Sequence, residues 1–171
     1  MKTEIITYVR LLHIVFGTIW VGSNLFMALF LYPAVKRSGS IGSQFIPHLP
    51  KTNNMPMTMT ISGFIAIITG LWIIYYYSGF SWAYFSSSFG MCILIGGILA
   101  LIAFLNGVFY IRPKGLKIDE IGNKIAQSGN PPTEEDLSQI GKLSQAIVKA
   151  TNFEAEILLL CLIFMSLARY I

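Results

Sequence analysis

The sequence predicts an all-α fold, a four-helix transmembrane bundle with a helical cytoplasmic extension. Of the 171 residues, 54% are hydrophobic and only 12% are charged, whereas soluble domains carry about a quarter charged residues. Four apolar segments each reach the ~20 residues that cross the hydrocarbon core of a bilayer. The charged residues lie between these segments. We therefore predict a single transmembrane domain over residues 1–171.

Each span has its own boundary signals. The first, at about 5–35, is too long for the apolar part of a signal peptide, so we expect a retained helix that Pro33 ends. Pro56 suits the first turn of the second span, at about 57–77. The third covers about 87–111, where Pro113 and Gly115 are expected to end it, and the fourth covers about 150–171.

Two polar connectors join the spans, at 36–54 and 112–149. The first is rich in Gly, Ser and Pro and is expected to be irregular. The second has a weak helical pattern over 116–127, then breakers at 128–132, then Thr133–Asp136, which resembles a capping box. Since no breaker follows, we predict one long fourth helix that projects about 20 residues, or ~30 Å, beyond the bilayer.

The distribution of basic residues predicts the orientation. The connectors hold nine of the twelve Lys and Arg residues, so the positive-inside rule places them in the cytoplasm and both termini outside the plasma membrane. The short, aromatic-rich loop over 75–85 then faces outward. Because the basic residues flank membrane spans, the net charge of +4 does not indicate nucleic-acid binding.

The unusual residues of the first span share one helical face, at about 100° per residue: Arg10, His13, Gly17, Trp20 and Asn24. A histidine one turn before a glycine suits haem, because the imidazole can reach the iron and the glycine lets a macrocycle approach the backbone. Arg10 would pair with a propionate and Trp20 would stack. The alternative is a histidine bonded to a neighbouring helix, with Gly17 serving close packing.

The fourth span carries a matching face, made of Glu154, Leu158, Cys161, Met165 and Arg169. In antiparallel helices Met165 falls at the depth of His13, and Arg169 at that of Arg10. The pattern predicts a b-type haem with ligands His13 and Met165, with Met91 as an alternative sixth ligand or a five-coordinate iron. Equally, Met165 can be a gap-filler and both arginines can extend to the interface without any cofactor.

A second polar group occupies the cytoplasmic half of the spans: Asn24, Thr58, Ser62, Asn106 and Glu154, with Glu156 nearby. It suggests a proton path or a second cofactor site. We favour interhelical hydrogen bonds that hold the helices together. Copper is a further alternative, since Met55, Met57 and Met59 offer soft thioethers near His48.

Several short motifs resemble known families. Leu12-His13-Ile14, Gly17 and Trp20-Val21-Gly22 are similar to the opening helix of CopD-like and HemJ-like membrane proteins. Segments near 69–71, 111–113 and 165–170 resemble related four-helix proteins. The resemblance implies a haem b protein, a protoporphyrinogen-oxidising enzyme in HemJ-like members, or copper uptake in CopD-like members. Among its site residues it carries over His13, within its Gly and Trp context.

These observations predict a membrane-embedded haem b protein for electron transfer or redox chemistry, with a quinone, a porphyrin or a partner subunit as its redox partner. A copper-handling transporter is the alternative from another class. A third is a cofactor-free structural subunit of a larger membrane complex, with the cytoplasmic helices as the docking surface. The partners that we consider for the chain are the lipid bilayer, a second copy in a homo-oligomer and a larger membrane complex. The sequence contains no nucleophile with a base, P-loop or Rossmann fingerprint that would predict another kind of enzyme.

Overall fold

The computed structural model describes residues 2–39 and 54–171, and the described chain is helical apart from short turns. In chain order the elements are α1 (Lys2–Phe26), the π-helical turn η1 (Met27–Leu31), α2 (Tyr32–Arg37), α5 (Met55–Ser78), α6 (Trp82–Phe85), α7 (Ser88–Asn106), the π-helical turn η2 (Gly107–Ile111), α8 (Arg112–Ser128), α9 (Glu134–Leu167) and the 3₁₀ turn η3 (Ala168–Tyr170).

Four helical units are long and apolar enough to cross a membrane, as the sequence predicted. They are Glu4–Arg37, Met55–Ser78, Ser88–Ser128 and Glu134–Tyr170. Their exposed surface is rich in large apolar side chains, which suits contact with lipid because a bilayer offers no penalty for apolar exposure.

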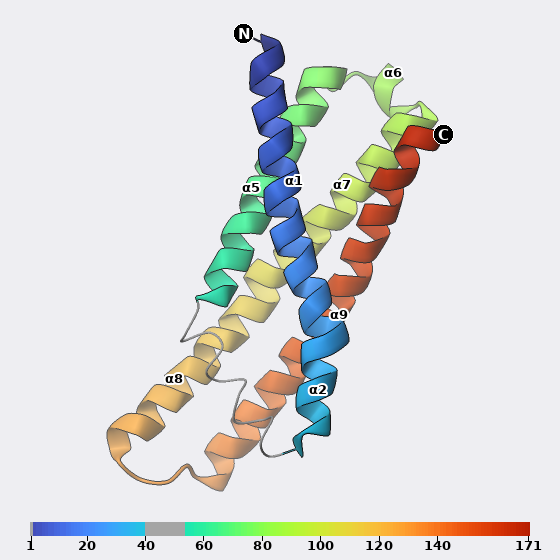
Figure 1. Cartoon of the computed structure of the whole chain (residues 1–171). Coiled ribbons are helices and arrows are strands. Elements are labelled where there is room, and N and C mark those ends of the chain that lie inside the picture. The colour runs from blue at the N-terminus through green and yellow to red at the C-terminus, as the bar shows by residue number, and fades with distance from the viewer. Residues whose placement is uncertain (1, 40–53) are drawn as a thin grey trace.

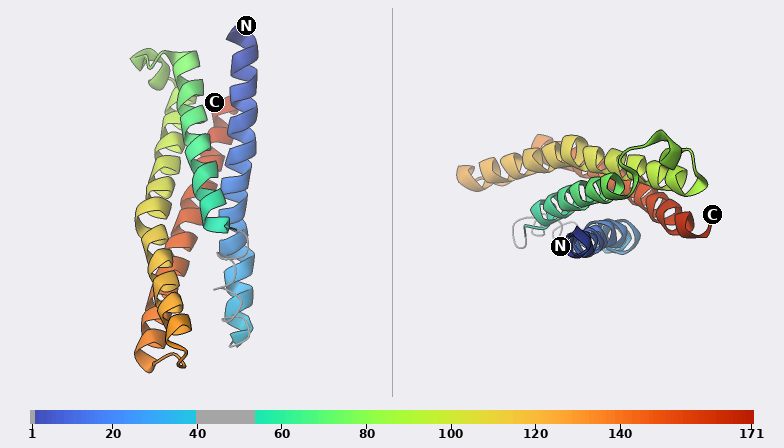
Figure 2. Two further views of the ribbon diagram at one scale, coloured as in Figure 1. Left: turned by 90° about the vertical axis from the view of Figure 1, so that its left-hand side faces the viewer. Right: turned by 90° about the horizontal axis from the view of Figure 1, so that it is seen from above.

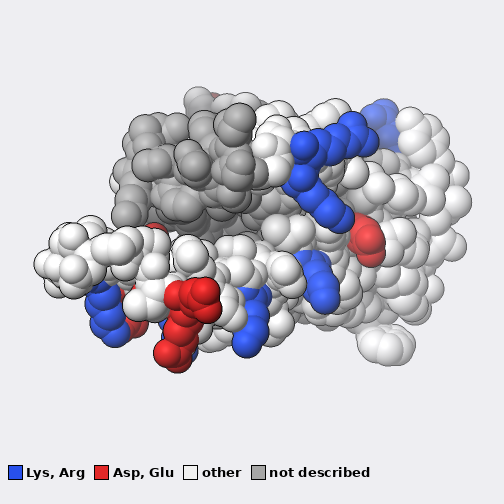
Figure 3. All heavy atoms as spheres, turned by 90° about the horizontal axis from the view of Figure 1, so that it is seen from below, with Lys and Arg blue, Asp and Glu red and all other residues white. Residues whose placement is uncertain are grey.

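The helices pack chiefly as two pairs, α1 with α5 and α7 with α9 (Figures 1 and 2). Both termini lie at one end of the molecule, called here the terminal end, together with the turn between α5 and α7. The opposite end, called the connector end, holds α2, α8 and the first half of α9. These helices extend beyond the start of α5 (Figure 1). Lys and Arg side chains are spread across the connector end, with fewer acidic ones among them (Figure 3).

The first and third helical units continue through prolines that were predicted to end them. Pro33 lies within α2 and Pro113, with Gly115, within α8. In a regular helix a proline ring clashes with the carbonyl four residues earlier. A π-helical turn precedes each proline, and the N–H groups of Tyr32 and Arg112 bond to carbonyls five residues back. The wider turn moves the obstructing carbonyl away from the proline ring. The hydrogen bonds change locally from the α-helical to the π-helical spacing, and the helix continues.

The fourth unit is one helix from Glu134 to Leu167, as predicted from its start signal. The Thr133 hydroxyl accepts from the Asp136 N–H at 3.1 Å, and the Asp136 carboxylate accepts from the Thr133 N–H at 3.1 Å. This reciprocal pair satisfies N–H groups that the first helical turn leaves free. The helix thus has a fixed beginning well outside the apolar segment of α9.

A cluster of buried side chains lies where the two helix pairs meet. This cluster, called here the central cluster, joins α1, α5, α7 and α9 and consists of Trp20, Val21, Ala66, Ala103 and Leu158. The Trp20 ring meets the Phe104 ring edge-on at 6.1 Å between centroids. Gly63 makes this possible, because a Cβ there would come within 3.0 Å of both rings. The cluster separates a region near the terminal end, around His13, from one near the connector end, around Glu154.

Candidate functional site

His13 projects from α1 onto α5. Its Nδ1 lies 2.8 Å from the carbonyl oxygen of Ala66 and 3.3 Å from the Thr69 hydroxyl. The ring rests on Gly70, where a Cβ would lie 3.0 Å from the His13 Cε1. Thr69 itself donates to the Ile65 carbonyl at 2.6 Å. The imidazole is therefore held between two helices that pack against each other along their length.

The short contact with a carbonyl fixes the proton on the ring. A carbonyl oxygen only accepts, so the Ala66 contact places the hydrogen on Nδ1. Nε2 then carries the lone pair, and no hydrogen bond reaches it from residues 2–39 or 54–171. Histidines that ligate metals usually have this arrangement, in which the second ring nitrogen donates to a carbonyl and orients the first.

The other predicted residues of α1 lie in different surroundings. Arg10 is exposed, and its guanidinium carbon lies 5.0 Å from the centre of the Tyr77 ring on α5. At Gly17 an added Cβ would meet nothing within 4 Å, so one turn from His13 the helix face is open. Trp20, 5% exposed, belongs to the central cluster instead. The α1 face predicted from spacing is thus divided between open surface and core.

Met165 lies on the second helix pair. Its side chain packs against α7, where a Cβ at Gly96 would lie 2.8 Å from the Met165 Cγ, and its sulfur lies 4.0 Å from that of Cys161. His13 contacts α5. The structure therefore brings His13 and Met165 to different neighbours. Arg169 is exposed in η3, and Met91 is exposed on α7.

The thioether group at the start of α5 is helical from its first member. Met55, Met57 and Met59 all lie in α5, and Met57 is exposed. Residues two apart in a helix diverge by about 200°, whereas residues four apart lie within about 40° of each other. Met55 and Met59 therefore share one face, and Met57 points away from it. His48, the other histidine of the copper hypothesis, lies outside the described residues. The described residues contain no group of three His, Cys, Asp or Glu side chains suited to a metal ion.

The polar group nearer the connector end is assembled around Glu154 of α9, which is only 3% exposed. The Asn106 amide of α7 donates to the Glu154 carboxylate at 3.2 Å and to the Ala150 carbonyl at 3.2 Å. The Trp20 indole and the Asn24 amide of α1 also point their donors at this carboxylate. Asn24 is 1% exposed and donates to the Trp20 carbonyl at 3.2 Å as well.

Only part of the predicted polar group belongs to this arrangement. Asn24, Asn106 and Glu154 meet, and Ser62 is buried on α5. Thr58 bonds instead to the Asn54 carbonyl of its own helix start. Glu156 lies two residues after Glu154, on the exposed side of α9.

The π-helical turns flank Glu154. Both η1 and η2 pack against α9. At the start of η2, a Cβ on Gly107 would lie 3.5 Å from a Glu154 carboxylate oxygen. Directly after η1, the Tyr32 hydroxyl bonds to the Thr151 side chain one turn from Glu154. Such single π turns within helices occur often at functional sites, and here they widen the helices at the level of a buried carboxylate.

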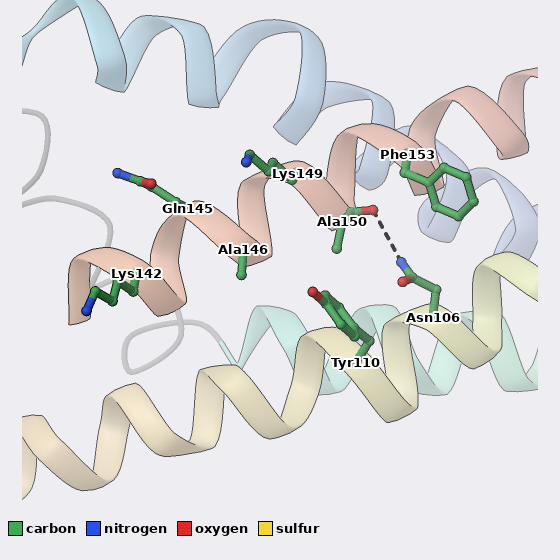
Figure 4. A pocket seen from close by; sticks show the side chains of 8 residues that line it. All are labelled: Asn106, Tyr110, Lys142, Gln145, Ala146, Lys149, Ala150 and Phe153. Carbon is green, nitrogen blue, oxygen red and sulfur yellow. Dashed lines mark hydrogen bonds between the residues drawn. The ribbon is translucent and has the colours of Figure 1, made fainter. Parts of the chain in front are cut away.

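An open cleft of about 500 Å³ lies between η2 and α9 and reaches Asn106 of this group. Figure 4 shows Tyr110 of η2 and Ala146 of α9 facing each other across it, with Asn106 at its inner end bonded to the Ala150 carbonyl. Lys142 and Lys149 lie at its rim, and Phe153 borders it near Asn106. Asn106 therefore touches the cleft on one side and Glu154 on the other.

Sequence reasoning missed the partners on α5 and the cleft. Gly70 and the Ala66 carbonyl carry no side-chain signal of their own, although the segment 66–70 combines Ala, Thr and Gly as close helix contacts require. The prolines at 33 and 113 were the available signal for the π turns.

No protein-family model, curated protein or solved structure matches this chain.

Proposed function

We propose that this chain is a membrane-embedded haem b protein for electron transfer or redox chemistry, with His13 as an axial ligand. One observation carries the proposal: the His13 Nδ1 bonds to the Ala66 carbonyl at 2.8 Å. That bond leaves the Nε2 lone pair for a metal ion and holds the ring in one orientation.

The residues around His13 fit a porphyrin in two respects. The open face at Gly17 leaves space next to the backbone one turn away. Arg10 lies one turn nearer the terminal end and can release Tyr77 to pair with a propionate, because a charge-assisted bond to a carboxylate is stronger than a contact with a ring. When bound, haem would supply one-electron chemistry, and its potential would be set by the axial ligands and by burial.

Met165 and Met91 are the candidates for a second protein ligand to the iron. Met165 would have to leave Gly96 on α7 to approach His13 on the other helix pair. Met91 is exposed on α7. A five-coordinate iron requires neither movement. Variants of these two methionines therefore distinguish the alternatives, since a lost ligand changes the spectrum and leaves the haem bound.

The proposed setting follows from charge and composition. The connector end would face the cytoplasm of a cell whose plasma membrane holds the four helices, because it carries most of the Lys and Arg residues. The His13 region would then lie near the outer face. There a quinone, a porphyrin or a partner subunit, including a second copy of the chain, would exchange electrons with the haem.

A reduced-minus-oxidised visible spectrum of the detergent-purified protein, with a pyridine haemochrome assay, tests the proposal. We expect sharp Soret and α bands at about one haem per chain after expression with ample haem. His48→Ala, which changes the only other histidine, serves as the matched control and should leave the spectrum unchanged.

A colourless preparation would contradict the haem proposal. Copper bound to that preparation and lost in Met55→Leu or Met57→Leu would establish the copper-handling alternative. A preparation with neither metal would favour a structural subunit.

A further inference from the structure

We propose that Glu154 is a proton-binding site that exchanges protons with the aqueous phase at the connector end, through the cleft that ends at Asn106. The proposal is independent of haem, since it concerns the opposite side of the central cluster. It assigns to the polar group a function beyond joining helices.

Glu154 places an ionisable group among apolar helices. A carboxyl group in the apolar part of a membrane protein is expensive, and such groups commonly mark ion or proton pathways. If joining helices were the sole requirement, amides such as Asn106 and Asn24 would meet it without an ionisable group. Glu154 is 3% exposed, yet its described contacts are neutral donors rather than a Lys or Arg that would hold it permanently ionised.

The cleft brings water close to Glu154. The cleft of about 500 Å³ extends along α9 from Lys142, in the connector-end half of that helix, to Asn106, with Tyr110 on one side and Ala146 on the other. A space of this size admits several water molecules, and its polar inner end gives them partners. Asn106 stands between this cleft and the carboxylate, bonded to both the Ala150 carbonyl and Glu154. Rotation of one amide would connect Glu154 to water.

Apolar packing closes the other side of Glu154. Towards the terminal end Glu154 meets the central cluster, in which Leu158 and Ala103 are fully buried and Trp20 fills the space between α1, α5 and α7. The Trp20 indole N–H points at the carboxylate itself, and the other side chains of this cluster are apolar, so they offer no chain of hydrogen-bonding groups for a proton. The site is therefore open to one aqueous phase only, as a proton-loading site requires.

The titratable and charged groups around Glu154 come from several elements. Tyr32, after η1, lies near enough to interact with the carboxylate and bonds to Thr151. Tyr110 of η2 and Lys149 of α9 line the cleft. Lys114 of α8 lies over the Tyr110 ring at 3.2 Å. The groups that α1 and α7 turn towards Glu154 are neutral.

The wild-type protein in lipid nanodiscs, treated with a water-soluble carbodiimide, tests the proposal. A protonated carboxyl adds to the carbodiimide and rearranges to a stable acylurea, which peptide mass spectrometry locates. We expect an adduct on Glu154 whose yield falls as the pH rises, because only the protonated form reacts. Exposed Glu134, at the start of α9, reports that the reagent is active.

Two tryptophan variants test the route. Ala146→Trp fills the cleft and should lower the labelling of Glu154 several-fold. The labelling of Glu134 should stay unchanged. Gln139→Trp, on the exposed surface of the same helix, is the matched control and should change neither.

Two results would overturn the proposal. Labelling of Glu134 and Glu156 without Glu154 at every pH would mean that the carboxylate is sealed and structural. Labelling of Glu154 that Ala146→Trp leaves unchanged would mean that the cleft is not its route to water. Because the unaltered protein carries the first result, failure of a variant to fold cannot decide the test.

Discussion

The regions around His13 and Glu154 place a titratable side chain among apolar helices in different ways. His13 contacts one neighbouring helix and keeps Nε2 without a described partner. Glu154 receives donors from α1 and α7 and is almost fully buried. A histidine with one ring nitrogen free of hydrogen bonds can bind a metal ion. A carboxylate that is surrounded by hydrogen-bond donors has no room for such a ligand, and it can only gain or lose a proton. The first region suits a cofactor and the second suits a proton.

The largest expected effect is on the histidine side of this comparison. His13→Ala removes the sole axial ligand that we assign and should abolish bound haem. Thr69→Ala, which removes only a weaker contact at 3.3 Å, should retain it. The pyridine haemochrome yield of each purified variant measures this difference. An undiminished haem content in His13→Ala would show that haem binds at another part of the chain.

The surface of α5 that the His13 imidazole contacts provides the next test. Gly70→Leu should displace the imidazole, because even a Cβ at this position would lie 3.0 Å from the His13 Cε1. We expect most of the haem to be lost, with a shifted Soret band in the remainder. Gly97→Leu on α7, where an added Cβ meets nothing within 4 Å, is the matched control. Equal spectra for the two variants would contradict the role of the α5 surface.

On the carboxylate side the expected effect is on stability. Asn106→Leu deprives Glu154 and the Ala150 carbonyl of their shared donor, and should lower the free energy of unfolding by about 1–2 kcal/mol. Haem content should not change, since the central cluster separates the two regions. Gln145→Leu, at the exposed edge of the cleft, should leave stability unaltered. Denaturant titration in mixed micelles measures both.

The smallest expected effect lies outside both regions and sets the scale for the others. Thr133→Ala removes the capping box of α9 and should lower the free energy of unfolding by about 1 kcal/mol. Neither haem content nor carbodiimide labelling of Glu154 should respond. Hydrogen exchange of the first turn of α9 would report the lost cap directly, and unchanged protection there would show that the cap contributes little.

The sequence predicted the elements better than their partners. Four apolar runs predicted four candidate spans, and Thr133 with Asp136 predicted the start of α9. The prolines misled, because a helix can pass a proline when a π turn precedes it. Helical periodicity grouped residues by face, yet it could not reveal that His13 faces α5 while Met165 faces α7. A face is a local property, and its partner depends on how helices far apart in the chain pack.

Replacing the proposed ligand and supplying it again tests the central claim most directly. His13→Gly removes the imidazole and leaves space against Gly70, so the protein should be purified without its Soret and α bands. Added imidazole together with haem should restore both bands, because the free ligand can occupy the vacated place. A His13→Gly protein that binds haem without imidazole, or that imidazole fails to restore while Trp fluorescence shows an intact fold, would contradict ligation by His13.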